Sequence, residues 1–169
     1  MKGYIKPNRL SFKFGTNEWM NYFGLPTGLI VLSFIDVYFY LKDINDKKAS
    51  VFLTSFILTF FVGIMTYKLQ MNRLRFKTFK LTKGLDEFKE KTRELLVKEK
   101  WVIDYDNIEY IQATYRGNIF NLDMLTLRYK KNEIQWNVIH HPQSYNSIAA
   151  LLSINRQGRR IIKIIKANA

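Results

Sequence analysis

One carboxylate stands inside a long apolar block near the N-terminus, where a charged group is costly. From 22 to 41 the chain reads YFGLPTGLIVLSFIDVYFYL, and Asp36 is its single charged residue. Deep in a bilayer such a group costs about 2.5 to 3.5 kcal/mol on insertion scales. Asp36 therefore needs a hydrogen-bonding partner or a proton, and the chemistry open to it is polar contact, proton binding or ion binding.

A second apolar block offers that partner. It reads VFLTSFILTFFVGIMTY and carries no charge. If the two blocks are antiparallel helices, Thr54 and Ser55 lie at the depth of Asp36, and either hydroxyl can donate to the carboxylate. Ser55, Thr59 and Gly63 also form a ridge of small residues that allows close helix packing. Two interpretations stay open: the polar group only tolerates its depth, or it serves an ion, a proton or another subunit.

Basic residues gather in two further places where no acid balances them. The chain has 27 Lys and Arg against 14 Asp and Glu, a net charge of +13. The first group follows the second apolar block, and the other lies near the C-terminus. Their members are Lys68, Arg73, Arg75, Lys77, Lys80 and Lys83 in the first group, and Arg156, Arg159, Arg160, Lys163 and Lys166 in the second.

These groups suit contact with a negatively charged partner. Beside a bilayer, anionic headgroups attract each Lys or Arg by about 1 kcal/mol. We therefore expect contact with anionic lipid headgroups or with a partner protein. Basic helices with nearby aromatic residues also suit nucleic acid, but a membrane topology explains the first group without any ligand. We do not expect nucleic acid as a partner.

The remaining candidates for chemistry are few. The chain has no cysteine, which excludes disulfides, thiolate metal sites and cysteine nucleophiles. His140 and His141 are its two histidines, and neighbours on a strand point to opposite faces, so they do not easily share a metal with Asp123 or Glu133. The sequence has no Gly-rich phosphate loop or nucleophile elbow. We expect no cofactor, no metal site and no enzyme activity.

The two apolar blocks have the length and composition of transmembrane helices. The first is about 30 Å long as a helix, which matches the hydrocarbon thickness of a bilayer. The second reaches the usual length when Ser50 and Lys68 are included. Neither block has the polar stripe of a soluble amphipathic helix. Pro26 is expected in the first turns, where a missing N–H costs least. The connector KDINDKKA allows only a tight antiparallel hairpin.

The flanking charges predict the orientation of this hairpin. Four Lys or Arg precede the first helix, three lie in the connector and six follow the second helix. By the positive-inside rule, both termini are cytoplasmic and the protein is a multi-pass protein of the inner membrane.

Residues after the hairpin predict a small α+β domain. GLDEFKEKTRELLVKEK has the periodicity and terminal charges of an amphipathic helix. The segments WVIDYD, IEYIQATYR, DMLTLRYK and EIQWNVIHH alternate as strands do. We expect three or four antiparallel strands in meander order, with Leu125, Leu127 and Ile134 facing the helices. A basic amphipathic helix ends the chain, starting between Ser147 and Asn155, and Gly158 is expected to kink or break it.

This order of elements resembles a family of small bacterial domains of unknown function that are often attached to membranes. The residues that carry the resemblance are Trp101, Ile111 to Ala113, Met124 to Leu127, Ile134 to Val138, and Asn155 with Arg159 and Ile162. The family has a Ser-containing segment after the last strand, which here reads HHPQSYNSIAALLS. The resemblance covers the C-terminal half, implies a fold and a bacterial membrane, and brings no activity.

Together these patterns predict four parts: a cytoplasmic segment 1–21, a transmembrane hairpin 22–68 with helices near 22–41 and 50–68, a basic linker or strand 69–83, and a cytoplasmic α+β domain 84–169. The expected function is that of a non-enzymatic accessory or scaffold subunit that binds anionic lipid or a partner protein. The alternative is an oligomerising membrane effector or transport component that uses Asp36.

Overall fold

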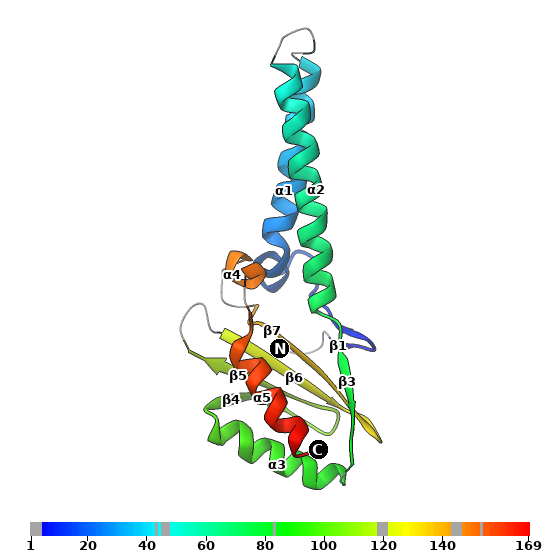
Figure 1. Cartoon of the computed structure of the whole chain (residues 1–169), viewed down its shortest axis with the longest axis vertical. Helices are drawn as coiled ribbons and strands as arrows, with labels where there is room; N and C mark the ends of the chain where they lie inside the picture. The colour runs from blue at the N-terminus through cyan, green and yellow to red at the C-terminus, as the bar shows by residue number, and fades with distance from the viewer. Residues whose placement is uncertain are drawn as a thin grey trace.

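A computed structural model describes residues 5–42, 44, 48–82, 84–117, 122–142, 147–152 and 154–169. Lys83, residues 43 and 45–47 of the connector, and residues 143–146 and 153 of the Ser-containing segment lie outside the described residues. Two long helices form a hairpin that stands away from an α+β domain (Figure 1). They are α1 (Asn17–Lys42) and α2 (Ala49–Arg73).

The hairpin packs closely along one seam and is exposed elsewhere. A Cβ atom on Gly63 would lie 2.8 Å from Cγ1 of Ile30, so only glycine fits where α2 meets α1. Farther along the seam, the rings of Phe39 and Phe52 stack with centroids 5.5 Å apart. Only 11% of the most apolar 18-residue window of each helix is buried. Both helices are long and apolar enough to cross a membrane.

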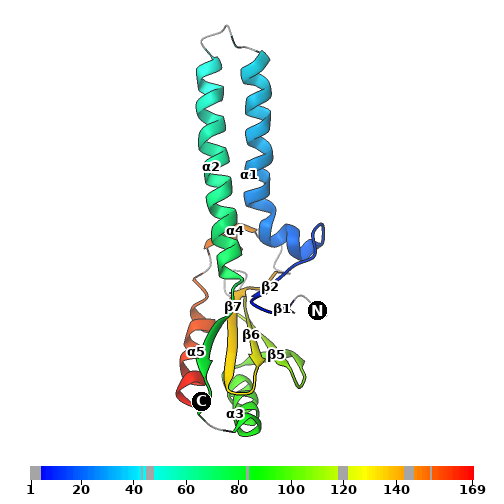
Figure 2. The same cartoon turned by 90° about the vertical axis from the view of Figure 1, so that its right-hand side faces the viewer.

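Both helices extend beyond their expected bounds. The backbone N–H of Trp19 donates to the hydroxyl of Thr16 at 3.3 Å, and this N-terminal cap starts α1 at Asn17 instead of 22. The expectation that Pro26 lies in the first turns is therefore wrong, because Pro26 is inside the helix. Since proline lacks the N–H that would bond the carbonyl of Tyr22, a bend is expected there. In Figure 2 the N-terminal part of α1 runs sideways beneath the rest.

The domain contains a five-stranded antiparallel sheet with the order β3-β7-β6-β5-β4. The strands are β3 (Lys77–Lys80), β4 (Trp101–Asp106), β5 (Tyr110–Arg116), β6 (Leu122–Tyr129) and β7 (Glu133–His140). The predicted meander of β4 to β7 is confirmed, but a sheet of only three or four strands is wrong, because β3 adds a fifth strand.

The short strand β3 has the sequence KTFK, which carries little alternating apolar pattern. Its one apolar residue, Phe79, pairs with Ile134 of β7. Lysines on an edge strand keep it from pairing with other chains, which explains the two lysines of KTFK. The same basic composition is also typical of a linker. The sheet domain therefore begins at Lys77, inside the segment 69–83 for which the sequence predicts a basic linker or strand.

Helices α3 (Leu85–Lys98) and α5 (Arg156–Ala167) pack on one face of the sheet. The predicted inward residues of β6 and β7 lie in this core. Its buried members include Phe88, Leu96, Leu125, Leu127, Ile134, Ile161, Ile162 and Ile165. The buried face of α3 follows the predicted stripe, with Phe88, Thr92 and Leu96 inside.

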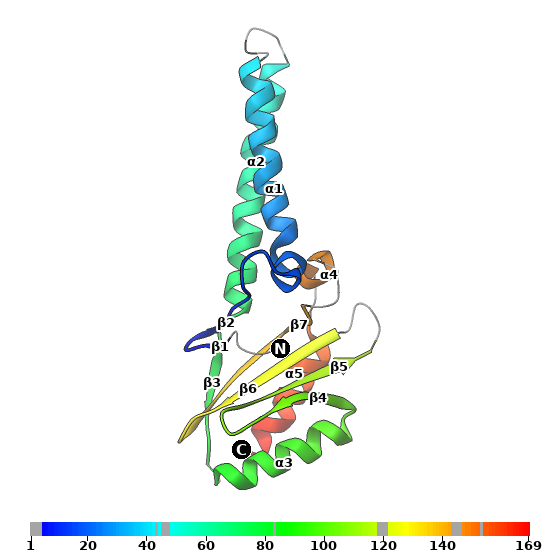
Figure 3. The ribbon, with the colours of Figure 1, turned by 180° about the vertical axis from the view of Figure 1, so that it is seen from behind.

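The other face of the sheet meets the base of the hairpin and the N-terminal segment, as the view from behind shows (Figure 3). Strands β1 (Ile5–Lys6) and β2 (Arg9–Leu10) form a small hairpin. The N–H of Leu10 donates to the carbonyl of Leu74 at 2.9 Å, which fastens the β1–β2 hairpin to the end of α2. A second apolar cluster, with Tyr22, Phe23 and Ile139 among its members, fills the junction.

The C-terminal segment breaks into α4 (Ser147–Leu152) and α5, but the break lies before Gly158. Asn155 adopts a left-handed conformation with φ 50° and separates the two helices. Gly158 lies inside α5, where a Cβ atom would come within 2.0 Å of Cγ1 of Val138. The glycine therefore allows a close approach of α5 to β7, and the expectation that it kinks or breaks the helix is wrong.

Candidate functional site

The two basic groups that are separate in the sequence meet at one edge of the sheet. β3 follows α2 directly, and α5 packs beside it. The ammonium group of Lys77 on β3 lies 5.2 Å from the centre of the Trp136 ring. Lys166 on α5 lies 4.8 Å from the same ring and 5.6 Å from the ring of Phe79. Such cation–π contacts hold both lysines over half-buried aromatic rings.

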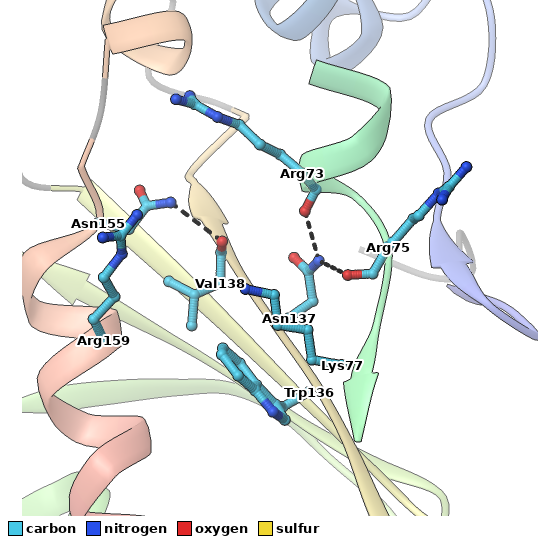
Figure 4. Close-up of a pocket in the computed structure, with 8 residues that line it drawn as sticks. All are labelled: Arg73, Arg75, Lys77, Trp136, Asn137, Val138, Asn155 and Arg159. Atoms are coloured by element: carbon cyan, nitrogen blue, oxygen red, sulfur yellow. Dashed lines mark hydrogen bonds between the residues drawn. The ribbon is translucent and has the colours of Figure 1, made fainter. Parts of the chain in front are cut away.

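A small pocket lies at this edge, where β7 continues past the end of β3 (Figure 4). Its volume is about 120 Å³. Trp136 and Val138 supply its apolar surface, and residues from α2, β3 and the start of α5 surround them. We call this the β7 pocket; its lining residues are Arg73, Arg75, Lys77, Trp136, Asn137, Val138, Asn155 and Arg159.

Two asparagines fix the walls of the β7 pocket. The side-chain amide of Asn137 donates to the carbonyls of Arg73 and Arg75, each at 2.8 Å, and so ties the end of α2 to the sheet. The side-chain amide of Asn155 donates to the carbonyl of Val138 at 3.2 Å. These bonds satisfy backbone groups at the point where β7 no longer has β3 beside it.

The cations around the β7 pocket do not all point into it. Figure 4 shows the side chains of Arg73 and Arg75 directed away, and Arg73 donates to the carbonyl of Leu151 at 2.7 Å, which ties α2 to α4. Lys77 extends between Asn137 and Val138, and Arg159 rises from α5 beside Asn155. Lys77 and Arg159 are therefore the two cations that an anion in the pocket would meet.

The first turn of α5 is held firmly, and this positions Arg159. The N–H of Gly158 donates to a carboxylate oxygen of Asp123 on β6 at 2.8 Å. Burial raises the pKa of Asp123, while the backbone N–H groups of Gly158 and Gln157 and the charge of Arg159 lower it in part. The close contact of Gly158 with Val138 sets the distance between α5 and the sheet.

The other predicted basic residues are spread around this region. Arg160 pairs with Glu99 at 3.1 Å, away from the pocket. Lys80 is exposed at the far end of β3, and Arg156 and Lys163 are exposed on α5. Lys68 lies near the end of α2 in the hairpin. The structure thus brings Lys77, Arg159 and Lys166 together and leaves these five apart.

Four pocket residues were not among the candidate site residues that the sequence predicted, although they lie within the segments that carry the family resemblance: Trp136, Asn137, Val138 and Asn155. Trp136 and Val138 pack against the core of the sheet domain and are both half-buried. An asparagine in the middle of a strand, between Trp136 and Val138, was the signal that could have found Asn137, because a buried amide needs partners.

The histidines lie away from the β7 pocket. His140 is the last residue of β7 and is buried, and His141 follows the strand and is half-buried. Burial lowers the pKa of both imidazoles. Asp123 is bound to α5, and Glu133 pairs with Lys130 at 3.1 Å. Within the described ranges, no group of three His, Asp or Glu side chains is placed to hold a metal ion.

Asp36 has a partner inside the hairpin. The hydroxyl of Ser55 donates to the Asp36 carboxylate at 2.9 Å, across the seam between α1 and α2. Thr54 and Thr59 bond instead to backbone carbonyls one turn earlier, those of Ser50 and Ser55, each at 2.8 Å. Ser55 is thus the hydroxyl that meets the carboxylate.

The comparisons with known proteins add no relative. No family model, curated protein or solved structure matches the chain.

Proposed function

We propose that this chain is an integral protein of the bacterial inner membrane that crosses the bilayer twice, with both termini and the α+β domain in the cytoplasm. The domain acts as a non-enzymatic accessory or scaffold module that binds anionic lipid headgroups or a partner protein. The observation that carries the proposal is the exposed apolar surface of α1 and α2. Next to the end of α2 lies the basic edge of the domain, which consists of Arg75, Lys77, Arg159 and Lys166.

The exposure of the hairpin supports insertion. Large apolar side chains are more than half exposed along both helices, among them Val31, Phe34, Leu58 and Phe61. The core helices of a soluble protein bury such residues, and contiguous apolar surface of this length is rare on soluble monomers. A bilayer removes this surface from water.

The position of the basic edge supports binding at the membrane surface. Arg75 and Lys77 follow directly on the last turn of α2, and Arg159 and Lys166 lie beside them. Electrostatic attraction to anionic lipid extends only about 8 Å at physiological salt, so groups next to the hairpin benefit most. The resemblance to bacterial membrane-attached domains agrees with this placement.

The hydrogen bond between Ser55 and Asp36 supports a structural role for that carboxylate. A polar group satisfied within one chain needs no ion or second subunit. This favours the accessory or scaffold role over an oligomerising effector or transport component.

The test uses the full-length protein in lipid nanodiscs with and without phosphatidylglycerol. Hydrogen exchange should be slower in β3 and α5 in the anionic discs, and added salt should reverse the change. Equal exchange in both discs, or stronger protection by added RNA, would contradict lipid binding. Release of the protein from native membranes by an alkaline wash would contradict insertion. Purification from native membranes in mild detergent then tests for a stable companion.

A further inference from the structure

We propose that the β7 pocket binds a phosphomonoester group, with Lys77 and Arg159 as its ligands. The proposal deepens the proposed function. It rests on that function only where the ligand is a lipid, because a lipid reaches the pocket only if the protein is in a membrane. The same chemistry is offered by a lipid with a phosphomonoester headgroup and by a soluble phosphomonoester.

The first argument is charge. Lys77 and Arg159 are exposed, and among the ion pairs of the described residues neither is joined to an acid. Lys166 shares the ring of Trp136 with Lys77, so a third cation stands close by. Asp123, the acid that interacts with Arg159, is buried and accepts the N–H of Gly158. Like charges held near one another favour an anion between them.

The second argument is the number of donors. Arg159 presents a planar fork of N–H groups that matches phosphate oxygens, and Lys77 adds an ammonium group with three donors. A phosphomonoester carries a charge close to −2 above its second pKa of about 6. Two to three cations therefore match a monoester better than a phosphodiester, which carries a charge of −1.

The third argument is size and place. A pocket of about 120 Å³ exceeds what a few waters need, since one water requires about 10 to 15 Å³ of such volume. It is large enough to admit a phosphate group. Trp136 and Val138 give it an apolar side, and it lies under the last turn of α2. An apolar wall beside two cations suits the junction of a headgroup with its glycerol.

The test compares two double variants of the full-length protein. Lys77→Gln/Arg159→Gln removes the two pocket cations. Lys80→Gln/Arg156→Gln removes one lysine from β3 and one arginine from α5 outside the pocket, so the loss of charge and the elements are the same. Circular dichroism and thermal unfolding establish that both variants fold as the wild type does.

Two probes distinguish the sources. Glycerol 3-phosphate is titrated against protein in nanodiscs of neutral lipid, and phosphatidic acid is compared with phosphatidylglycerol as a component of the discs. We expect the pocket variant to bind a phosphomonoester at least tenfold more weakly, and the control variant to stay within threefold of the wild type. Wild-type protein should prefer phosphatidic acid to phosphatidylglycerol at least tenfold if the source is lipid, or bind glycerol 3-phosphate in solution if it is soluble.

Equal weakening in the two variants would overturn the proposal, because the effect would then come from total charge. Binding of neither phosphomonoester by the wild type would overturn it as well, as would equal affinity for the two lipids together with no affinity for glycerol 3-phosphate. An alkaline wash of membranes that contain the same variants measures membrane insertion independently of ligand binding. A protein that stays in the membrane but fails these titrations refutes only the pocket, whereas a protein released by the wash refutes the proposed function.

Discussion

Gly158→Ala tests how α5 is held against the sheet. The added Cβ would lie 2.0 Å from Cγ1 of Val138 and 3.1 Å from its Cβ and Cγ2. Carbon atoms in ordinary contact are about 3.5 to 4.0 Å apart, so α5 or Val138 must move. Because Gly158 N–H binds Asp123, a shift of the helix also lengthens that bond.

The size of the effect follows from two opposing contributions. Overpacking of this kind costs about 1 to 3 kcal/mol. Replacing glycine by alanine in a helix returns up to about 1 kcal/mol. We expect a net loss of about 1 to 2 kcal/mol in the free energy of unfolding of the domain. For a domain of this size, that lowers the melting temperature by about 5 to 15 °C.

The assay is thermal unfolding of the full-length protein in detergent, followed by near-ultraviolet circular dichroism. Val138→Ala removes the two methyl groups that the new Cβ meets, at a cost of about 1 kcal/mol for a half-buried valine. The loss in the free energy of unfolding of the double variant should be smaller than the sum of the two single losses by at least about 1 kcal/mol. An unchanged melting temperature for Gly158→Ala, or strictly additive losses, would refute the reasoning.

Three further predictions concern other regions. Asp36→Asn should leave membrane insertion intact and change stability by no more than about 0.6 kcal/mol, because Ser55 still has an acceptor across the seam; loss of assembly with normal insertion would point to an ion or subunit site. Gly63→Leu should disrupt the hairpin, since even a Cβ would lie 2.8 Å from Ile30, and cross-linking across the seam should fall. Burial lowers the pKa of His140 below its unfolded value of about 6.5, so at low pH the unfolded chain binds more protons than the folded chain. The free energy of unfolding should therefore hold its full value above pH 6.5 and decrease below it, by up to about 1.4 kcal/mol per pH unit. His140→Phe should flatten that slope in unfolding curves between about pH 7.5 and 5.

The sequence was informative where a repeating pattern recorded burial. The meander of β4 to β7 and the inward faces of Leu125 and Ile134 followed from period-two alternation. The depth match of Asp36 and Ser55 followed from simple antiparallel geometry. These features depend on residues that are close in the sequence or that lie on consecutive elements joined by one hairpin connection.

Features that depend on distant contacts could not be foreseen. KTFK becomes a strand only because β7 has a free edge next to the end of α2, and no local pattern records that edge. Gly158 reads as a helix breaker until Val138 is found against it. The β7 pocket needs α2, β3, β7 and α5 together, so the basic groups were visible in the sequence and their meeting place was not.

Labelling of single cysteines in intact cells tests the central claim most directly, and the chain is suited to it because it has no cysteine of its own. Ile44 lies in the connector between α1 and α2, and Lys131 lies in the turn between β6 and β7; both are exposed. A membrane-impermeant maleimide should label Ile44→Cys from outside the inner membrane and Lys131→Cys only after that membrane is permeabilised. Labelling of Lys131→Cys in intact cells, or equal labelling of both positions in the soluble fraction, would contradict a hairpin that crosses the membrane and holds its domain in the cytoplasm.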